Sequence, residues 1–128
     1  MNKFLIVMMF AGVASGSALG GTKVTGVVQV DTQNRHAFGS VGSARNSADS
    51  VQYIGCTVFS YSDGTASAWC GGRDANYGYG ACTTSVPALV DQARNLKGDS
   101  YLNVYWDSNY ACTSIEVRNH SYYEPKAQ

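Results

Sequence analysis

The sequence predicts an α+β domain, in which an antiparallel β-sheet of about five strands carries one α-helix over about 86–97 and two disulfides cross-link the chain. Segments on both sides of that helix alternate apolar and polar residues with a period of two, which is typical of half-buried strands. Residues 86–97 instead repeat apolar side chains at steps of three and four, the period of a helix. Four cysteines follow an apolar leader, as is typical of small exported domains with disulfides.

The first twenty residues have the layout of a secretory signal peptide. Lys3 precedes an apolar run over 4–13, and small residues predominate over 14–20. The run is shorter than the roughly 20 apolar residues that a membrane-spanning helix needs, so we expect no stable membrane insertion. We therefore expect residues 1–20 to be cleaved and residues 21–128 to form a single small domain that is secreted or periplasmic.

Two segments lie between the leader and the first cysteine. Residues 22–31 place Val24, Val28 and Val30 in a largely alternating pattern, which predicts a first strand. Residues 32–50 are polar and small, and they contain few apolar anchors. Because a structureless connection of that length is unusual in a compact domain, we expect a short strand or a functional loop within it.

A β-hairpin is predicted around the first two cysteines. Residues 51–61 are rich in β-branched and aromatic types, and a second strand over 65–70 follows the triplet Ser-Asp-Gly at 62–64. If Tyr61 pairs with Thr65, each step back along the first strand is matched by one step forward along the second. Cys56 then lies opposite Cys70. That position is a non-hydrogen-bonded pair, where the strands are closest and a cross-strand bridge is most feasible.

The favoured disulfides are therefore Cys56–Cys70 and Cys82–Cys112. A metal site is not expected, because no Cys-x-x-Cys pair is present and neither histidine is close to a cysteine in the sequence. No cofactor motif is present either, so none is expected.

The remaining elements follow in order along the chain. Residues 71–81 are rich in glycine and predict a surface loop. In the helix, Ser85 is the expected N-cap and Gly98 the expected stop. Residues 100–107 and 111–120 each alternate apolar with polar side chains, which predicts a half-solvated antiparallel hairpin.

The charge balance argues against one large class of partners. Without Lys3, the nine basic residues become eight, against nine acidic ones, and no basic run is present. Nonspecific binding to nucleic acids or anionic membranes draws its affinity from clustered positive charge, so nucleic acid is not an expected partner unless the chain is a nuclease.

The sharpest catalytic hypothesis concerns the last predicted strand. Glu116, Arg118 and His120 follow one another at two-residue steps and would project from one face, with neighbours about 7 Å apart. A base, a guanidinium and an acid suit metal-free phosphodiester cleavage, and His36 could supply a second imidazole. The overall profile resembles the microbial guanyl-type ribonucleases in composition and layout, and no residue role is transferred from them. Charged residues on the wet face of a strand are also expected without any catalysis.

The leading hypothesis is a noncatalytic binding or interaction module that recognises a glycan or a protein surface. Tyrosine offers a large, rigid contact area with a polar tip, although it also stabilises the solvent face of a sheet without any ligand. The candidate binding residues are Arg73 and four tyrosines expected to point outward, Tyr77, Tyr79, Tyr101 and Tyr105. A third hypothesis is a secreted inhibitor that uses 71–81 as a braced loop.

Overall fold

The structure is a computed structural model, and it describes residues 21–125. The expected signal peptide, residues 1–20, lies outside the described residues. Among residues 21–125 there is no helix with the length and apolar character needed to cross a membrane.

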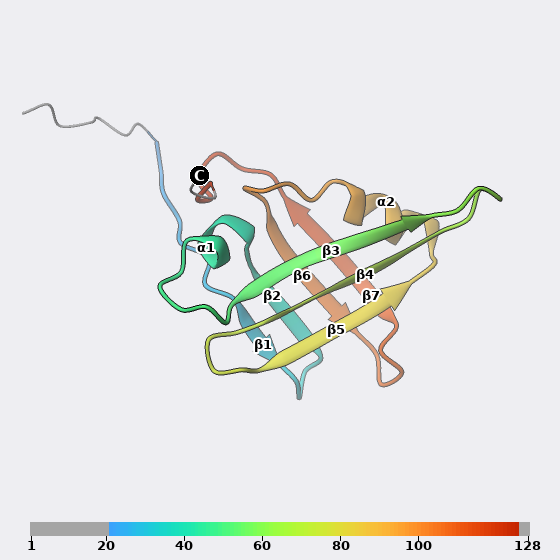
Figure 1. The fold of residues 1–128 in the computed structure, drawn as a ribbon, viewed down its shortest axis with the longest axis horizontal. Coiled ribbons are helices and arrows are strands. Elements are labelled where there is room, and N and C mark those ends of the chain that lie inside the picture. Colours follow the sequence, from blue (N-terminus) through green and yellow to red (C-terminus); the bar gives the residue numbers. More distant parts are fainter. Residues whose placement is uncertain (1–20, 126–128) are drawn as a thin grey trace, which may run out of the picture.

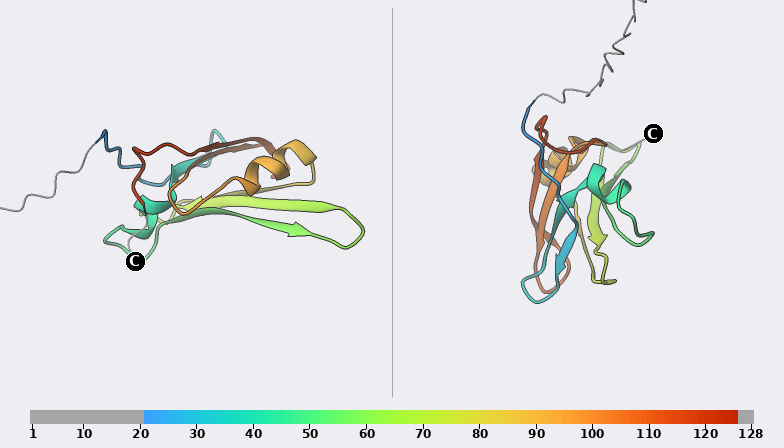
Figure 2. Two further views of the ribbon diagram at one scale, coloured as in Figure 1. Left: turned by 90° about the horizontal axis from the view of Figure 1, so that it is seen from above. Right: turned by 90° about the vertical axis from the view of Figure 1, so that its left-hand side faces the viewer.

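The described chain forms seven strands and two short helices. The strands make two sheets, one with the order β1-β2-β6-β7 and one with the order β3-β4-β5, and all pairings within them are antiparallel. Figures 1 and 2 show the sheets facing each other as two layers. In chain order the elements are β1 (Gln29–Asp31), β2 (His36–Ser40), α1 (Val41–Arg45), β3 (Tyr53–Ser60), β4 (Ala66–Arg73), β5 (Tyr79–Thr84), α2 (Pro87–Arg94), β6 (Tyr101–Trp106) and β7 (Cys112–Arg118).

The predicted antiparallel character is confirmed, but the prediction of one sheet of about five strands with a single helix is only roughly matched. Each sheet alternates buried and exposed residues, and the buried sides meet in one core. Leu102, Val104 and Trp106 lie on the inner side of the four-stranded sheet, opposite Cys70 and its neighbours in the other sheet. Such a core between two inner faces is that of a β-sandwich.

One close contact across the sandwich depends on a glycine. A Cβ added at Gly80 of β5 would lie 2.5 Å from Cη2 of Trp106. No side chain larger than hydrogen fits there while the indole keeps its place. Gly80 therefore allows the Trp106 ring to lie directly against the backbone of β5.

The glycine-rich segment 71–81, expected as a surface loop, is mostly strand. β4 continues to Arg73 and β5 begins at Tyr79, so only a short turn over 74–78 connects them. In that turn the Asp74 carboxylate accepts hydrogen bonds from the N–H groups of Asn76 and Gly78. The loop prediction is wrong because these glycines permit close approach within and between the sheets, as at Gly80.

Other boundaries also differ from the predictions. The polar segment 32–50 contains the expected short strand, β2, and in addition the helix α1, while the predicted first strand over 22–31 is reduced to β1. The predicted helix over about 86–97 is shorter, because α2 ends at Arg94 and Gly98 does not stop it. Ser85 is not its cap. Val86 occupies that position, and its N–H donates to the Thr84 hydroxyl instead.

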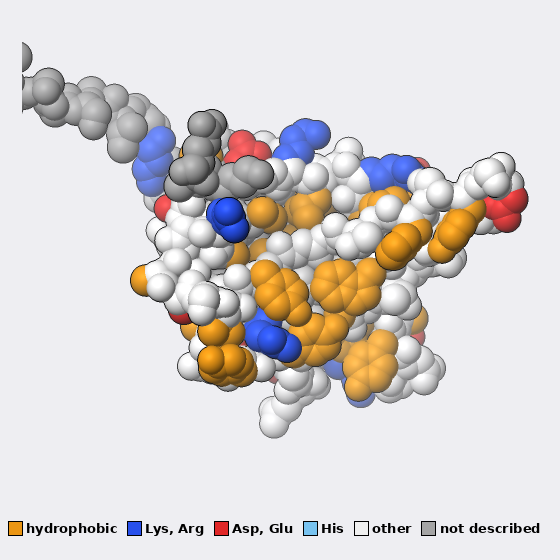
Figure 3. Space-filling model, viewed as in Figure 1, with side chains coloured by type: hydrophobic (Ala, Val, Ile, Leu, Met, Phe, Trp, Pro, Cys, Tyr) orange, Lys and Arg blue, Asp and Glu red, His pale blue; other side chains and the backbone are white. Residues whose placement is uncertain are grey.

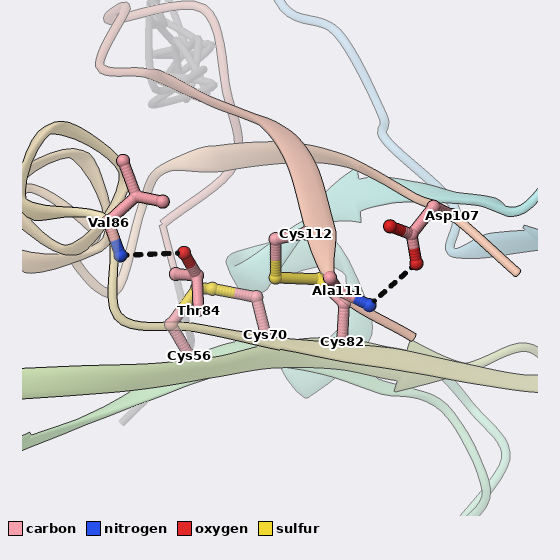
Figure 4. The surroundings of a disulfide bond; sticks show 8 residues. All are labelled: Cys56, Cys70, Cys82, Thr84, Val86, Asp107, Ala111 and Cys112. Atoms are coloured by element: carbon pink, nitrogen blue, oxygen red, sulfur yellow. Dashed lines mark hydrogen bonds between the residues drawn. A yellow bond between two sulfur atoms is a disulfide. The ribbon is translucent and has the colours of Figure 1, made fainter. Parts of the chain in front are cut away.

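Both favoured disulfides, Cys56–Cys70 and Cys82–Cys112, are present. The hairpin register is the expected one, with Cys56 opposite Cys70 at a Cα–Cα distance of 4.1 Å. Cys70 in turn lies opposite Cys82, so the two bridges are neighbours on the inner face of the three-stranded sheet (Figure 4). The second bridge joins β5 to β7 and therefore links the two layers.

The two ends of the described chain meet beside α1. Val24 and Tyr123 form a parallel bridge, and the Val24 N–H donates to the Tyr122 carbonyl at 2.8 Å. Tyr123 is buried and stacks on Tyr101. The Ser43 hydroxyl of α1 also donates to the Glu124 carboxylate at 3.0 Å, which fixes the last described residues to the body.

An aspartate turn positions the start of β3 and predicts an acid-sensitive contribution to stability. The Asp49 carboxylate accepts hydrogen bonds from the Gln52 backbone and side-chain N–H groups and from the Val51 N–H, and these lower its pKa from 3.8 to about 2. Gln52 in turn accepts the N–H of Val28 through its side-chain oxygen. Because the folded-state pKa is the lower one, the carboxylate stabilises the fold above about pH 4, and this contribution is lost as the pH falls towards 2.

We therefore expect Asp49→Asn to lower the melting temperature at neutral pH and to flatten its decline between pH 4 and pH 2. Circular dichroism melts across that range measure both effects. The control is Asp99→Asn, because Asp99 is exposed and accepts no hydrogen bond from a described residue. Parallel pH profiles for wild type and Asp49→Asn would contradict the prediction.

Candidate functional site

The sandwich presents two outer faces, and the candidate binding residues divide between them. Arg73 and Tyr79 lie on the three-stranded sheet, whereas Tyr101 and Tyr105 lie on the four-stranded sheet. Tyr77 is in the turn between β4 and β5, at a φ of 66°, with its side chain 71% exposed. The five residues therefore do not form a single patch.

We call the outer side of the three-stranded sheet the aromatic face. Its large side chains are Tyr53, Phe59, Trp69, Arg73 and Tyr79, all of which are exposed or half-buried. Figure 3 views the molecule from this side, where hydrophobic side chains gather over β3, β4 and β5 and basic side chains lie among them. An exposed aromatic cluster of this kind is characteristic of a binding surface.

Three side chains form a cross-strand row at one end of this face. The register places Tyr53 opposite Arg73, and Arg73 opposite Tyr79. The guanidinium carbon of Arg73 lies 5.8 Å from the centre of the Tyr53 ring and 5.6 Å from the centre of the Tyr79 ring. Cation–π attraction to both rings therefore holds the guanidinium between them.

A strip of residues with small or no side chains separates this row from the next aromatic side chain. Gly55, Gly71 and Ala81 are paired across the sheet, and a Cβ added at Gly55 would meet no atom within 4 Å. Beyond them Trp69 lies between two threonines, Thr57 and Thr83, in the same register. The face thus has the Tyr53–Arg73–Tyr79 row and the single ring of Trp69, with a shallow strip between them.

Two hollows border the aromatic face along β5. The first has a volume of about 610 Å³, and its lining includes Trp69, Tyr79, Tyr110 and Arg35. The second, of about 470 Å³, shares Trp69 and Thr83 with the first and extends to Phe59. Trp69 therefore stands between two hollows, and a long ligand could contact it from both sides.

The outer side of the four-stranded sheet carries the catalytic candidates, and we call it the polar face. Nε2 of His36 is hydrogen-bonded to Oδ1 of Asn103, and the His36 ring stacks on Tyr105 with a centroid distance of 3.9 Å. Asn103 lies opposite Glu116 on β7, whose Oε1 accepts a hydrogen bond from Nε of Arg118 at 2.5 Å. The structure thus brings His36, Glu116 and Arg118 to the same face.

His120 lies beyond the end of β7 and has no direct contact with Glu116 or Arg118, although its ring packs beside Tyr123, which hydrogen-bonds to Arg118. The His120 ring stacks on Tyr122 with a centroid distance of 4.8 Å. Arg118 is already engaged, because hydrogen bonds to Tyr123 and Glu116 raise the pKa of its guanidinium further above neutrality. It also lies over the Tyr101 ring. The three residues expected on one strand face are therefore reduced to Glu116 and Arg118, with His36 added from β2.

Sequence reasoning missed Tyr53, Phe59 and Trp69. A signal for Tyr53 was available, because the register that pairs Cys56 with Cys70 also pairs Tyr53 with Arg73 once β4 is extended beyond the second cysteine. The inhibitor hypothesis depended on 71–81 as a long loop, and that segment is mostly strand.

Within residues 21–125 there is no cluster of three or more histidine, cysteine or acidic side chains that could hold a metal ion. Comparison of the chain with protein-family models, with curated proteins and with solved structures finds no match.

Proposed function

We propose that this protein is a noncatalytic binding module that acts outside the cytoplasm and holds a glycan chain on its aromatic face. The observation that carries the proposal is the Tyr53–Arg73–Tyr79 row together with the Trp69 ring, on an exposed sheet surface bordered by two hollows. The two disulfides fit a protein that folds in an oxidising compartment, which supports the proposed location.

A glycan suits the chemistry of this surface. Sugar rings have an apolar face and a rim of hydroxyl groups, and they need apolar planes beside polar partners. The aromatic face supplies both, because the Trp69 ring is flanked by the hydroxyl groups of Thr57 and Thr83. Since Trp69 and Arg73 are four residues apart on one strand, their side chains are separated by about 13 Å, which suits contacts with separate units of an extended chain.

The test is binding of the oxidised protein to a panel of soluble polysaccharides, measured by isothermal titration calorimetry. We expect Trp69→Ala to weaken binding about tenfold or more, because the loss of one stacked aromatic contact is worth about 1.4 kcal/mol or more. Tyr105→Ala removes an exposed aromatic ring from the opposite face and should leave the affinity unchanged. No binding to any polysaccharide, or equal losses in the two variants, would contradict the proposal.

A second candidate function is metal-free cleavage of phosphodiesters on the polar face. It is favoured by one observation, the placement of His36, Asn103, Glu116 and Arg118 on adjacent strands of one sheet. An imidazole and a carboxylate could act as acid and base, with the guanidinium stabilising the phosphate.

The second candidate predicts cleavage of a fluorescent single-stranded RNA in the presence of EDTA. His36→Ala and Glu116→Gln should both abolish that cleavage, whereas His120→Ala should retain it, because the His120 ring lies beyond the end of β7 and stacks on Tyr122. Absence of cleavage by the wild-type protein would eliminate this candidate.

A further inference from the structure

We propose that the ligand of the aromatic face is an acidic glycan and that Arg73 binds its anionic group. This inference rests on the proposed function, and it names the class of glycan. The group it requires is a carboxylate or a sulfate ester on a sugar unit that lies between the Tyr53–Arg73–Tyr79 row and Trp69.

Arg73 forms no ion pair within the described chain. The ion pairs described join Arg94 to Asp91 on α2 and Arg118 to Glu116 on β7, and neither pair includes Arg73. The adjacent carboxylate, Asp74, accepts hydrogen bonds from backbone N–H groups at distances of 2.8–3.3 Å. These bonds hold the Asp74 carboxylate against the turn and against β1.

The hydrogen-bond donors of Arg73 have no acceptor among the described residues. Among the described residues the guanidinium donates no hydrogen bond, and Nε is buried without a partner. Only Nε is buried in this way, so the two terminal nitrogens reach the surface. Because Tyr53 and Tyr79 flank the guanidinium from the two neighbouring strands, its outward edge is the part left for a ligand. An arginine edge matches the geometry of carboxylate and sulfate oxygens.

The aromatic face itself carries no acidic side chain, and the nearest carboxylates described, Asp74 and Asp107, are held by backbone N–H groups of their own turns. The outward residues of β3, β4 and β5 include no aspartate or glutamate. The hollow beside Tyr79 adds a second cation, Arg35, and one acid, Asp107. The Asp107 carboxylate accepts the N–H groups of Asn109 and Ala111, at 2.8 Å and 3.0 Å. The face thus offers a fixed positive charge to an incoming anion.

The tyrosine rings also prepare Arg73 for binding. A free arginine side chain loses rotamer freedom when it pairs with a ligand. Here the two rings already hold the guanidinium in place, so less freedom remains to be lost. We therefore expect the selectivity for acidic ligands to depend on the arginine itself and not merely on a positive charge at this position.

The test uses matched glycans that differ only in charge. One pair is polygalacturonate and its fully methyl-esterified form, and the other is dextran sulfate and dextran. We expect the wild-type protein to bind at least one acidic member about tenfold or more tightly than its neutral partner at about 0.1 M salt, and to lose this preference as salt is raised. The pair that shows the preference distinguishes a carboxylate from a sulfate.

Variants then assign the preference to Arg73. We expect Arg73→Gln to bring the ratio of acidic to neutral affinity close to one, and Arg73→Lys to restore it only in part. Arg94→Gln removes an exposed arginine on α2 and should leave the ratio unchanged. Circular dichroism checks that each variant is folded. If a variant fails to fold, the ratio of acidic to neutral affinity measured for the wild-type protein still tests the preference for acidic glycans.

The outcomes separate the inference from the proposed function. Equal affinity for acidic and neutral partners, together with the loss of binding in Trp69→Ala, would overturn the role of Arg73 and leave the glycan-binding function intact. A preference that survives in Arg73→Gln would overturn the inference as well. No binding to either member of either pair would count against both the glycan-binding function and the inference that rests on it.

Discussion

Replacement of Cys82 and Cys112 together by alanine is expected to lower the free energy of unfolding by roughly 4 kcal/mol. The bridge closes a loop with a sequence separation of 30, and chain entropy gives about that value for such a loop. Both cysteines are buried, and they connect β5 to β7 across the core. Because small domains are stable by only about 5–15 kcal/mol, this loss would bring the protein close to unfolding.

The matched control is the double replacement of Cys56 and Cys70. Its loop is shorter, with a separation of 14, for which chain entropy gives roughly 3 kcal/mol, and it joins strands already paired along their length. Urea unfolding followed by tryptophan fluorescence compares the two variants. A loss for the Cys56 and Cys70 variant that equals or exceeds the other would show that the bridge between the layers is not the more important one.

The second large effect is expected for Trp106→Ala, which should destabilise the fold by about 3–5 kcal/mol. The Trp106 side chain is buried between the sheets and lies against Gly80, which has no side chain of its own to fill the space that the indole would leave. The cavity would therefore persist in the variant. Chemical unfolding of the oxidised protein, followed by circular dichroism, measures the change.

Trp69→Ala is the natural comparison, because it makes the same chemical change on the outer side of the other sheet. The Trp69 ring is half-buried, so we expect less than half the destabilisation caused by Trp106→Ala. It should instead impair the proposed binding of glycans. If Trp69→Ala destabilised the protein as much as Trp106→Ala, Trp69 would be a core residue and the aromatic face would lose its central contact.

The parts of the fold that were predictable from the sequence depend on residues close together in the chain. The loop at 62–64 determines the register of β3 and β4, which places Cys56 opposite Cys70, and the remaining pair follows by elimination. The apolar repeat that indicates α2 is likewise local. Each of these patterns involves one helix or two consecutive strands. It can therefore be recognised within a short stretch of the sequence.

The division into two sheets was not predictable in the same way. β2 contains only five residues within a polar segment, and β5 includes Gly80, which resembles loop composition until Trp106 packs on it. The aromatic face depends on β5, which the sequence did not predict, since Tyr79 joins Arg73 only through the pairing of β4 with β5. The grouping of His36 with Glu116 similarly requires β2 and β7 to flank β6.

The bridge between Val24 and Tyr123 has a practical consequence for engineering. Because the two ends of the described chain are neighbours, a short peptide could join them without crossing the body. New ends could then be opened at the exposed hairpin loop, residues 62–64. Neither the junction nor the new ends would contain a residue of the aromatic face. Such a circular permutant could be displayed on a surface or linked in tandem, so that several copies engage one strand of the proposed polysaccharide ligand at once.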